Sequence, residues 1–193
     1  MRVDNSLKLL FTSTTRQDLL NLFFSNPQEL YYPRQLSRLI HQEINSVRRE
    51  LDNLKKAGLV ISDPRSNKMY YQANTQSDLY PDLVTLVCKN CGLGQRLAKS
   101  KNQIGSVKAV LASRNFLYKQ PSLADQIDLI IIGSVILPEL EYVLKQEEES
   151  QKREINFMLM TESEFHLRQN RRDPALVDFF LALPTAIIGG LSK

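Results

Sequence analysis

Apolar residues recur with helical spacing in the first ninety residues, and in the second half they form short runs typical of strands. The first helix is predicted to run through Phe24, because leucines and phenylalanines recur there every three or four positions. Thr14 or Thr15 can cap its beginning. Asn26-Pro27 is expected to end it, since proline cannot continue a helix. The chain therefore begins with an amphipathic helix.

Two further helices and a hairpin are predicted after this helix. Pro33 suits the first position of a helix and keeps the residues before it extended. A break at His41-Gln42 separates this helix from the next one, which runs to Ala57 and ends at Gly58, a residue typical of helix ends. Strand-forming residues then flank a turn at residues 63–67, which carries Asp, Pro, Ser and Asn. Helix, helix, helix and hairpin is the winged helix-turn-helix arrangement.

The second half is predicted to be a small α/β domain with a mixed sheet. Strands are expected at residues 107–112, 127–132, 155–160 and 186–188, and helices at residues 79–90, 137–149, from 161 onward, and 174–183. Thr161-Glu162-Ser163-Glu164 is a capping box at the start of one helix, and Glu147-Glu148-Glu149 is expected to be a solvated helix end. Gly92-Leu93-Gly94 marks a boundary, so we expect domains at residues 1–90 and 91–193. The predicted class is α+β.

Positive charge is concentrated in the helix pair and the hairpin. From Pro33 to Gln72, eight lysines and arginines stand against four acids, an excess that equals the formal net charge of +4 for the whole chain. A basic helix pair followed by a basic hairpin suits the phosphate surface of duplex DNA better than a small-molecule pocket. The sequence therefore predicts a protein that binds double-stranded DNA.

The helix at about residues 43–57 is the predicted recognition helix. On a helical wheel, Ile44, Val47, Leu51 and Leu54 cluster on one side and polar side chains occupy the other. In helix-turn-helix docking, the first turns of such a helix enter the major groove. The hairpin at residues 59–72 would then lie on the DNA backbone or in the minor groove. The candidate DNA contacts are Arg34, Arg38, Gln42, Asn45, Ser46, Arg48, Arg49, Lys56, Arg65 and Lys68.

These candidates are expected to act in different ways. The base-edge candidates are Asn45, Ser46 and Arg49, because arginine can bridge guanine O6 and N7 and asparagine adenine N6 and N7. The phosphate candidates are Arg34, Arg38, Lys55 and Lys56, with Arg65 and Lys68 reaching out from the hairpin. The alternative is an amphipathic helix whose polar face only meets water, and for any single residue both interpretations stay open.

Residues 15–88 resemble the winged helix domains of ArsR-like transcriptional regulators. The resemblance is carried by PRQLSRLIHQEINSVRRELDNLKKAGLVISDPRSNKMYYQAN at residues 33–74, and above all by VRRELDNLKKAGLV within it. We accordingly expect a cytoplasmic, sequence-specific regulator of transcription. It would be a homodimer whose two recognition helices lie about one DNA turn apart. The apolar N-terminal residues Leu7, Leu9, Leu10 and Phe11 are one candidate dimer contact.

The remainder resembles the minimal nucleotidyltransferase-like domain that some of these regulators carry. The matching stretches are CGLGQRL at residues 91–97, DQIDLIIIG at 125–133, REIN at 153–156 and DPALVDFFLALPTAIIGG at 173–190. Active members of that family grip a nucleotide phosphate with a Gly-Ser turn. They hold Mg²⁺ with two aspartates one residue apart on a strand, and usually with a third aspartate on a neighbouring strand. Alternate residues of a strand point the same way, so such a pair aims both carboxylates at one metal.

This chain departs from that pattern at each position. Ala112-Ser113 stands at the Gly-Ser turn, Gln126 at the first aspartate and Asn156 at the third, which leaves Asp128 as the one carboxylate of the set. We therefore expect a domain without enzymatic activity, retained for folding, dimerisation or ligand sensing. Asp128 is expected to be a sheet-end residue that caps a nearby helix or satisfies backbone amides. The alternative is an active, antitoxin-type nucleotidyltransferase that transfers a nucleotide to a partner protein.

Composition argues against several other classes. No apolar run approaches the roughly 18 residues of a membrane span, and no secretion signal is recognised. The two cysteines, Cys88 and Cys91, form no disulfide framework, which fits a reducing cytoplasm. A zinc site would need two further ligands, so we expect neither a metal nor a cofactor, and the sequence identifies no effector. A third class that stays open is an interaction module whose winged helix binds no DNA.

Overall fold

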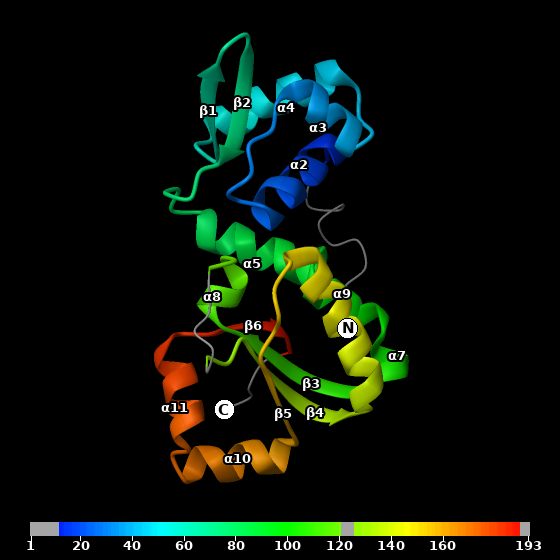
Figure 1. Cartoon of the computed structure of the whole chain (residues 1–193), viewed down its shortest axis with the longest axis vertical. Helices are drawn as coiled ribbons and strands as arrows, with labels where there is room; N and C mark the ends of the chain where they lie inside the picture. The colour runs from blue at the N-terminus through cyan, green and yellow to red at the C-terminus, as the bar shows by residue number, and fades with distance from the viewer. Residues whose placement is uncertain (1–11, 121–125, 190–193) are drawn as a thin grey trace. The chain divides into compact units, whose positions relative to one another are not determined.

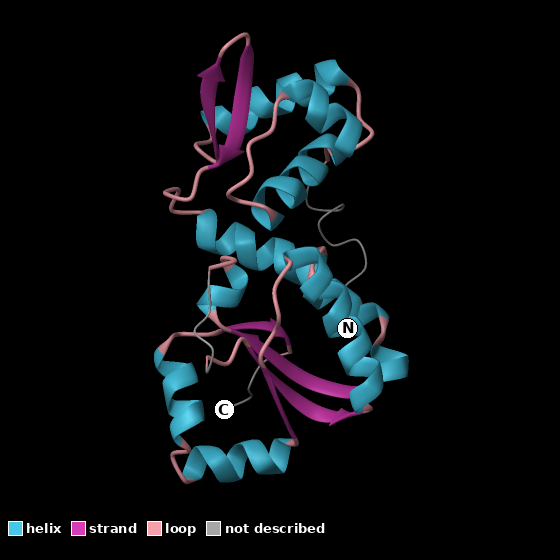
Figure 2. Ribbon diagram, viewed as in Figure 1, coloured by secondary structure: helices cyan, strands magenta, loops and turns pink. Residues whose placement is uncertain are grey.

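Two sheets organise the chain, a two-stranded hairpin and a four-stranded sheet (Figure 1, Figure 2). The computed structural model describes residues 12–120 and 126–189. The chain divides into two compact units, Met1–Asn90 and Cys91–Lys193, and each unit holds one of the sheets. The predicted α+β class is confirmed. The candidate dimer contact at Leu7, Leu9, Leu10 and Phe11 lies outside the described residues.

In the first unit, helices precede and follow the hairpin along the chain. The described ones are α2 (Thr14–Ser25), α3 (Pro33–Leu39), α4 (Ile44–Lys56) and α5 (Tyr80–Asn90). The prediction that Thr14 or Thr15 caps α2 is wrong, because both residues are already helical. Ser13 has the extended backbone that a cap requires, and its Oγ accepts a hydrogen bond from the Arg16 backbone N at 3.2 Å. Thr15 is buried, and its hydroxyl donates to Gln42 Oε1 at 3.2 Å.

The core of the first unit is built from the apolar stripes of its helices. Fully buried side chains include Leu19 and Phe23 of α2, Leu36 of α3, and Val47 and Leu51 of α4. The three helices therefore share one apolar interior, and this interior decides which side of α4 faces inward. The other side of α4 is left for solvent or a partner.

The end of α4 depends on Gly58. Ala57 caps the helix, and Gly58 has φ of +69°, a left-handed conformation that favours glycine. The Gly58 backbone N donates to the Lys55 carbonyl and the Leu59 backbone N donates to the Leu54 carbonyl, both at 3.0 Å. These two bonds make the Schellman motif, which satisfies carbonyls that a helix end would leave unpaired. The prediction that the helix ends at Gly58 is confirmed.

We expect Gly58→Ala to lower the free energy of unfolding by about 1 kcal/mol. An added Cβ would meet no atom within 4 Å, so the loss comes from backbone strain and not from a clash. Urea unfolding of the two proteins measures the difference. Gly58→Asn is the matched control and should lose less, because asparagine tolerates the left-handed region better than alanine. A Gly58→Ala protein as stable as the wild type would contradict this account.

The hairpin that follows α4 has a tighter turn than predicted. β1 (Val60–Arg65) and β2 (Lys68–Ala73) pair antiparallel along their whole length. The predicted five-residue turn at 63–67 is wrong, because strand pairing continues through Pro64 to Arg65 and only Ser66 and Asn67 form the turn. A proline fits an edge strand of this kind, where its missing N–H breaks no ladder bond.

The predicted extended piece before α3 joins this hairpin. The Tyr31 backbone N donates to the Tyr71 carbonyl at 2.9 Å, and the Tyr71 backbone N donates to the Tyr31 carbonyl at 2.8 Å. The Tyr31 ring also meets the Phe23 ring edge to face, with 5.8 Å between centroids. These contacts attach the hairpin to the helices of the same unit.

The second unit is built on the four-stranded sheet, in the order β5-β4-β3-β6. Its strands are β3 (Gly105–Ala112), β4 (Leu129–Val135), β5 (Phe157–Met160) and β6 (Thr185–Ile188). β3 runs antiparallel to β4 and β6, while β4 and β5 run parallel, so the sheet is mixed. Residues 129–133 of β4 are all buried, as their continuous apolar run predicts for a central strand.

Helices connect and cover these strands. The described ones are α6 (Leu93–Lys99), α7 (Lys101–Ile104), α8 (Arg114–Leu117), α9 (Leu137–Gln151), α10 (Glu162–Asn170) and α11 (Pro174–Leu181). α9 makes the crossover that the parallel pair β4 and β5 requires. Phe165 of α10 and Leu176 and Phe179 of α11 belong to the core cluster on the sheet. Thr161 caps α10 as predicted, its Oγ1 accepting from the Glu164 backbone N at 3.2 Å.

The prediction that residues 147–149 form a solvated helix end is wrong for Glu147, which is only 6% exposed. Helical spacing places Glu147 on the same side of α9 as the buried Val143 and Leu144. Its carboxylate lies 3.1 Å from Arg96 Nη1 of α6 and accepts from Gln151 Nε2 at 2.8 Å. The buried charge is therefore paired within the unit.

None of the helices in the described parts of the chain has the length and apolar character that a membrane span requires.

Candidate functional site

The outward side of α4 carries the three base-edge candidates. Asn45 and Arg49 are exposed, and Ser46 is half-buried. Val47 and Leu51 hold the opposite side of the helix in the core, as the helical wheel predicts. Because Asn45 and Arg49 are four positions apart, they lie one turn apart on the same face. The structure thus leaves this polar face accessible in the described part of the first unit.

Glu50 is a buried residue of α4 that the wheel did not identify. It is 4% exposed, whereas Ile44, which was expected in the core, is half-buried. Glu50 Oε2 accepts a hydrogen bond from Arg16 Nε of α2 at 2.9 Å. Burial by itself raises the pKa of Glu50, but hydrogen bonds from Arg16, Ser13 and Asn53 together with the Arg16 charge outweigh it, so the pKa is lowered. This ion pair ties α4 to α2.

We expect Glu50→Gln to destabilise the protein by about 1–2 kcal/mol near neutral pH and by less in acid. A carboxyl whose folded pKa is lowered stabilises the fold above its unfolded pKa, near 4.5. That stability disappears as the pH falls through the lower folded value. Urea unfolding of both proteins near neutral pH and at about pH 3 measures the change. Glu43→Gln, which removes an exposed carboxylate beside the same helix, should have little effect. A Glu50→Gln difference that is equal at both pH values would contradict the assignment.

Gln42 is placed differently from the other candidates. Its side chain is half-buried, with Nε2 donating to Asp18 Oδ2 at 3.1 Å and Oε1 accepting from the Thr15 hydroxyl. The Ser37 hydroxyl also donates to the Gln42 carbonyl at 2.6 Å. Gln42 therefore fixes the turn between α3 and α4, where His41 has a positive φ of 52°. Its position suits the orientation of α4 more than direct contact with a ligand.

Exposed basic side chains are carried by α3, α4 and the hairpin. They are Arg34, Arg38, Arg48, Arg49, Lys55, Lys56 and Lys68. Within the described residues none of these seven forms an ion pair with a carboxylate. Two of the four acids in the same region are already neutralised, Glu50 by Arg16 and Asp63 by Arg65. The excess positive charge of α3, α4 and the hairpin is thus free to attract an anionic partner.

The tip of the hairpin holds its two basic residues in different ways. Arg65 Nε lies 2.7 Å from Asp63 Oδ2, and both side chains are more than half exposed. Such an exposed pair adds little stability, so the arginine can exchange partners readily. Lys68 Nζ lies 4.5 Å from the centroid of the Tyr32 ring, which itself meets the Tyr70 ring edge to face. The rings therefore position Lys68 on the surface of the hairpin.

Asp128 is buried at the start of the central strand of the second unit. Its side chain is 1% exposed, Oδ1 lies 2.5 Å from Arg153 Nη2, and Oδ2 accepts from the Asn156 backbone N at 3.1 Å. The contact with the Asn156 amide agrees with the expectation that Asp128 satisfies a backbone amide. The Arg153 partner was not expected. Gln126 and Asp128 both precede β4, so they do not lie at alternate positions of a strand as the Asp-x-Asp pattern requires.

The other residues aligned with the nucleotidyltransferase pattern serve local structure. Ser113 is buried, and its Oγ accepts from the Phe116 backbone N at 3.1 Å, which caps α8. The Asn156 side chain is exposed and its Nδ2 donates to the Gln126 carbonyl at 3.3 Å. The structure therefore brings Asp128, Gln126 and Asn156 into one neighbourhood through hydrogen bonds. The carboxylate in that neighbourhood is occupied by Arg153.

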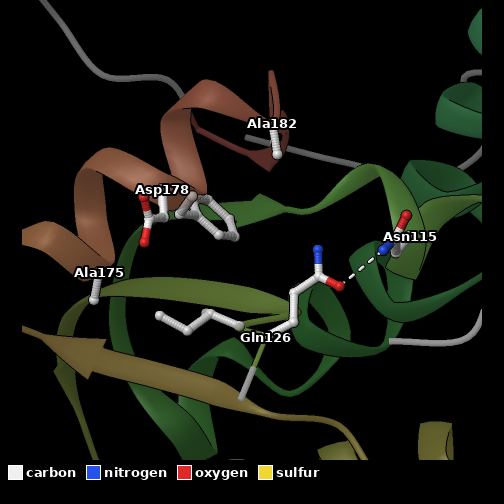
Figure 3. Close-up of a pocket in the computed structure, with 7 residues that line it drawn as sticks. Asn115, Gln126, Ala175, Asp178 and Ala182 are labelled. Atoms are coloured by element: carbon white, nitrogen blue, oxygen red, sulfur yellow. Dashed lines mark hydrogen bonds between the residues drawn. The ribbon is translucent and has the colours of Figure 1, made fainter. Parts of the chain in front are cut away.

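A pocket of about 700 Å³ opens beside Gln126 (Figure 3). It is lined by Asn115, Gln126, Ile127, Ala175, Asp178, Phe179 and Ala182. Figure 3 shows the Asn115 and Gln126 side chains joined by a hydrogen bond, in which Asn115 Nδ2 donates to Gln126 Oε1 at 2.8 Å. Of the four residues aligned with the nucleotidyltransferase pattern (Ser113, Gln126, Asp128 and Asn156), it is Gln126 that lines the pocket. The pocket could not be predicted from the sequence, because its lining comes from three separate segments of the chain.

The remaining sequence features carry no site of their own. Cys88 lies in α5 and Cys91 just after it, and both side chains are half-buried. In the ranges 12–120 and 126–189, no group of three or more His, Cys, Asp or Glu side chains is arranged to hold a metal ion. Comparison of the chain with protein-family models, with curated proteins and with solved structures finds no match.

Proposed function

We propose that residues 1–90 form a winged helix-turn-helix domain that binds duplex DNA sequence-specifically, and that the protein regulates transcription. The observation that carries the proposal is the surface formed by α3, α4 and the hairpin. Seven exposed cations with no carboxylate partner among the described residues lie on these elements, which also carry the exposed polar face of α4. A polyanion is the partner that such a surface attracts most strongly.

The dimensions and chemistry of α4 suit the major groove. A helix of 13 residues is about 20 Å long, and the groove admits a single helix. We infer that Asn45 and Arg49 contact base edges from adjacent turns, with Ser46 beside them. Arginine pairs with guanine and asparagine with adenine in the bidentate contacts that discriminate bases best. Sequence preference would therefore come mainly from Asn45 and Arg49.

The other basic residues would position the domain on the DNA backbone. Arg34 and Arg38 lie on α3 and Lys56 at the end of α4, so they are expected to contact phosphates on either side of the groove. Lys68 would reach a phosphate or the minor groove from the hairpin. The contacts of Gln42 and Glu50 with α2 support this model, because they hold α4 rigidly while it reads the bases.

We also propose that two copies of the protein bind together, with recognition helices about one DNA turn apart. Selection of bound fragments from random duplex DNA by the full chain tests this and the sequence preference at once. The expected result is an enriched inverted repeat whose half-sites are about 10 base pairs apart. The double variant Asn45→Ala/Arg49→Ala should lose enrichment at specific base pairs while retaining weak, salt-sensitive binding. Recovery of fragments with no common sequence would contradict the proposal.

For the second unit we propose a nucleotidyltransferase-like domain without transferase activity. Three observations support this: Arg153 neutralises Asp128, amides stand at the Gln126 and Asn156 positions, and the Ser113 hydroxyl caps α8. The test is incubation with labelled nucleoside triphosphates, Mg²⁺ or Mn²⁺ and cell extract. Transfer of label that is lost in the isosteric Asp128→Asn variant would overturn this part of the proposal.

A further inference from the structure

We propose that the pocket beside Gln126 binds a small organic cation, in the form of an ammonium group carried on an aromatic or apolar body. The pocket lies wholly within the second unit, and the proposal is independent of DNA binding. Its volume of about 700 Å³ is in the range of sites for small molecules. Its chemistry is set by α11 on one side and by Asn115, Gln126 and Ile127 on the other.

One face of α11 leaves the space open. Ala175, Asp178 and Ala182 recur at intervals of three and four residues, so they share that face of the helix. The two alanines have short side chains, and the volume in front of them stays unfilled. Phe179 and Ile127 add apolar surface. An aromatic or aliphatic body can be buried against these walls.

The polar groups of the pocket favour a positive ligand. Among the described residues that line the pocket, Asp178 is the one ionisable residue, and its carboxylate forms neither an ion pair nor a hydrogen bond with any described residue. The hydrogen bond between Asn115 and Gln126 uses Asn115 Nδ2 and Gln126 Oε1, which leaves Asn115 Oδ1 as a second acceptor. An ammonium group carries three donors and no acceptor, so a carboxylate and an amide oxygen are the partners it needs.

The same lining disfavours anions. No lysine, arginine or histidine is among the described residues that line the pocket, so a phosphate or carboxylate would find no cation there. It would also meet the Asp178 charge, which repels it. Gln126 Nε2 and the second N–H of Asn115 Nδ2 remain as amide donors of this pair, and they can donate to a neutral oxygen of a ligand. A nucleoside triphosphate is therefore a poor fit for this space.

Calorimetric titration of the full chain with three indoles of similar size tests the inference. Tryptamine is a cation, tryptophol is neutral, and indole-3-propionate is an anion, so charge is the main variable. We expect tryptamine to bind about fivefold more tightly than tryptophol, because Asp178 is exposed and partly screened by water. Indole-3-propionate should bind at least about tenfold more weakly than tryptamine. ATP with Mg²⁺ should show no binding in this pocket.

Two variants connect the result to the pocket. Asp178→Asn keeps the shape and should make tryptamine and tryptophol bind equally, while Glu141→Gln removes an exposed charge elsewhere in the unit and should change nothing. Ala175→Leu fills the space and should abolish binding of both ligands, with the circular dichroism spectrum showing that the variant is folded. The inference is overturned if tryptamine fails to bind at millimolar concentration, or if indole-3-propionate binds as tightly. It is also overturned if the preference for tryptamine survives Asp178→Asn.

Discussion

Replacing Arg49 with alanine is expected to weaken binding to the selected duplex by about ten- to a hundredfold and to relax the preference at one base pair. Arg49 is exposed on the outward face of α4 and has no carboxylate partner among the described residues. The substitution should therefore remove a DNA contact without changing the fold. Fluorescence anisotropy on the selected sequence and on single-base variants of it measures both effects. The thermal unfolding midpoint should stay unchanged.

Two matched variants separate base contact from charge. Arg171→Ala removes an exposed arginine from the second unit and should change the affinity less than about twofold, because the proposed DNA contacts all belong to the first unit. Lys56→Ala should weaken binding to all sequences alike. It should also lower the steepness of log affinity against log salt concentration by about one, which corresponds to one phosphate contact. If Arg49→Ala behaves like Arg171→Ala, the outward face of α4 is not the surface that reads DNA.

Replacing Asp128 with alanine is expected to lower the free energy of unfolding of the second unit by about 3 kcal/mol. The Asp128 side chain is 1% exposed and that of Arg153 is 20% exposed, so the substitution leaves a largely buried guanidinium without its carboxylate partner. The Asn156 backbone N also loses the acceptor that Asp128 supplies. Urea unfolding, followed by a probe in the second unit, measures the loss.

An exposed ion pair of the same protein provides the control for Asp128. Asp63→Ala removes the carboxylate that contacts Arg65, in a pair where both side chains are more than half exposed. The expected loss there is below about 1 kcal/mol. Asp128→Asn keeps the shape and one acceptor, so its effect should lie between the two. Equal stability of the Asp128→Ala protein and the wild type would show that the buried pair does not support the sheet end.

Elements with a strong local pattern could be predicted from the sequence. The stripe of α4 and its end at Gly58 follow from helical spacing and from the left-handed conformation that glycine adopts. The apolar run at residues 127–132 predicted a strand, and the structure has β4 there from Leu129 to Val135. α6, α7 and α8 were missed, because stretches of four to seven residues are too short for a helical period to show. The turn of the hairpin is shorter than predicted. Pro64 is a residue typical of turns, but proline is also tolerated on an edge strand, and here it lies in β1.

The polar face of α4 could likewise be predicted, but the contacts that position it could not. Glu50 pairs with Arg16, which lies 34 positions earlier, and Gln42 bonds to Asp18, 24 positions earlier. No periodicity within α4 indicates which helix supplies the partner. The ion pair of Asp128 with Arg153 spans 25 positions, so no local pattern predicts it either. Polar contacts between residues that are far apart in the sequence are therefore the part of the site that the sequence pattern does not predict.

Amide signals of the isotope-labelled full chain, recorded by nuclear magnetic resonance during titration with the selected duplex, test most directly whether α4 lies in the major groove. We expect the largest shifts at residues 44–49 and at residues 66–68 of the hairpin, with shifts at Arg34 and Arg38. Signals of the sheet in the second unit should change far less. Shifts confined to the second unit, or unchanged signals for Asn45 and Arg49 at saturation, would contradict the account.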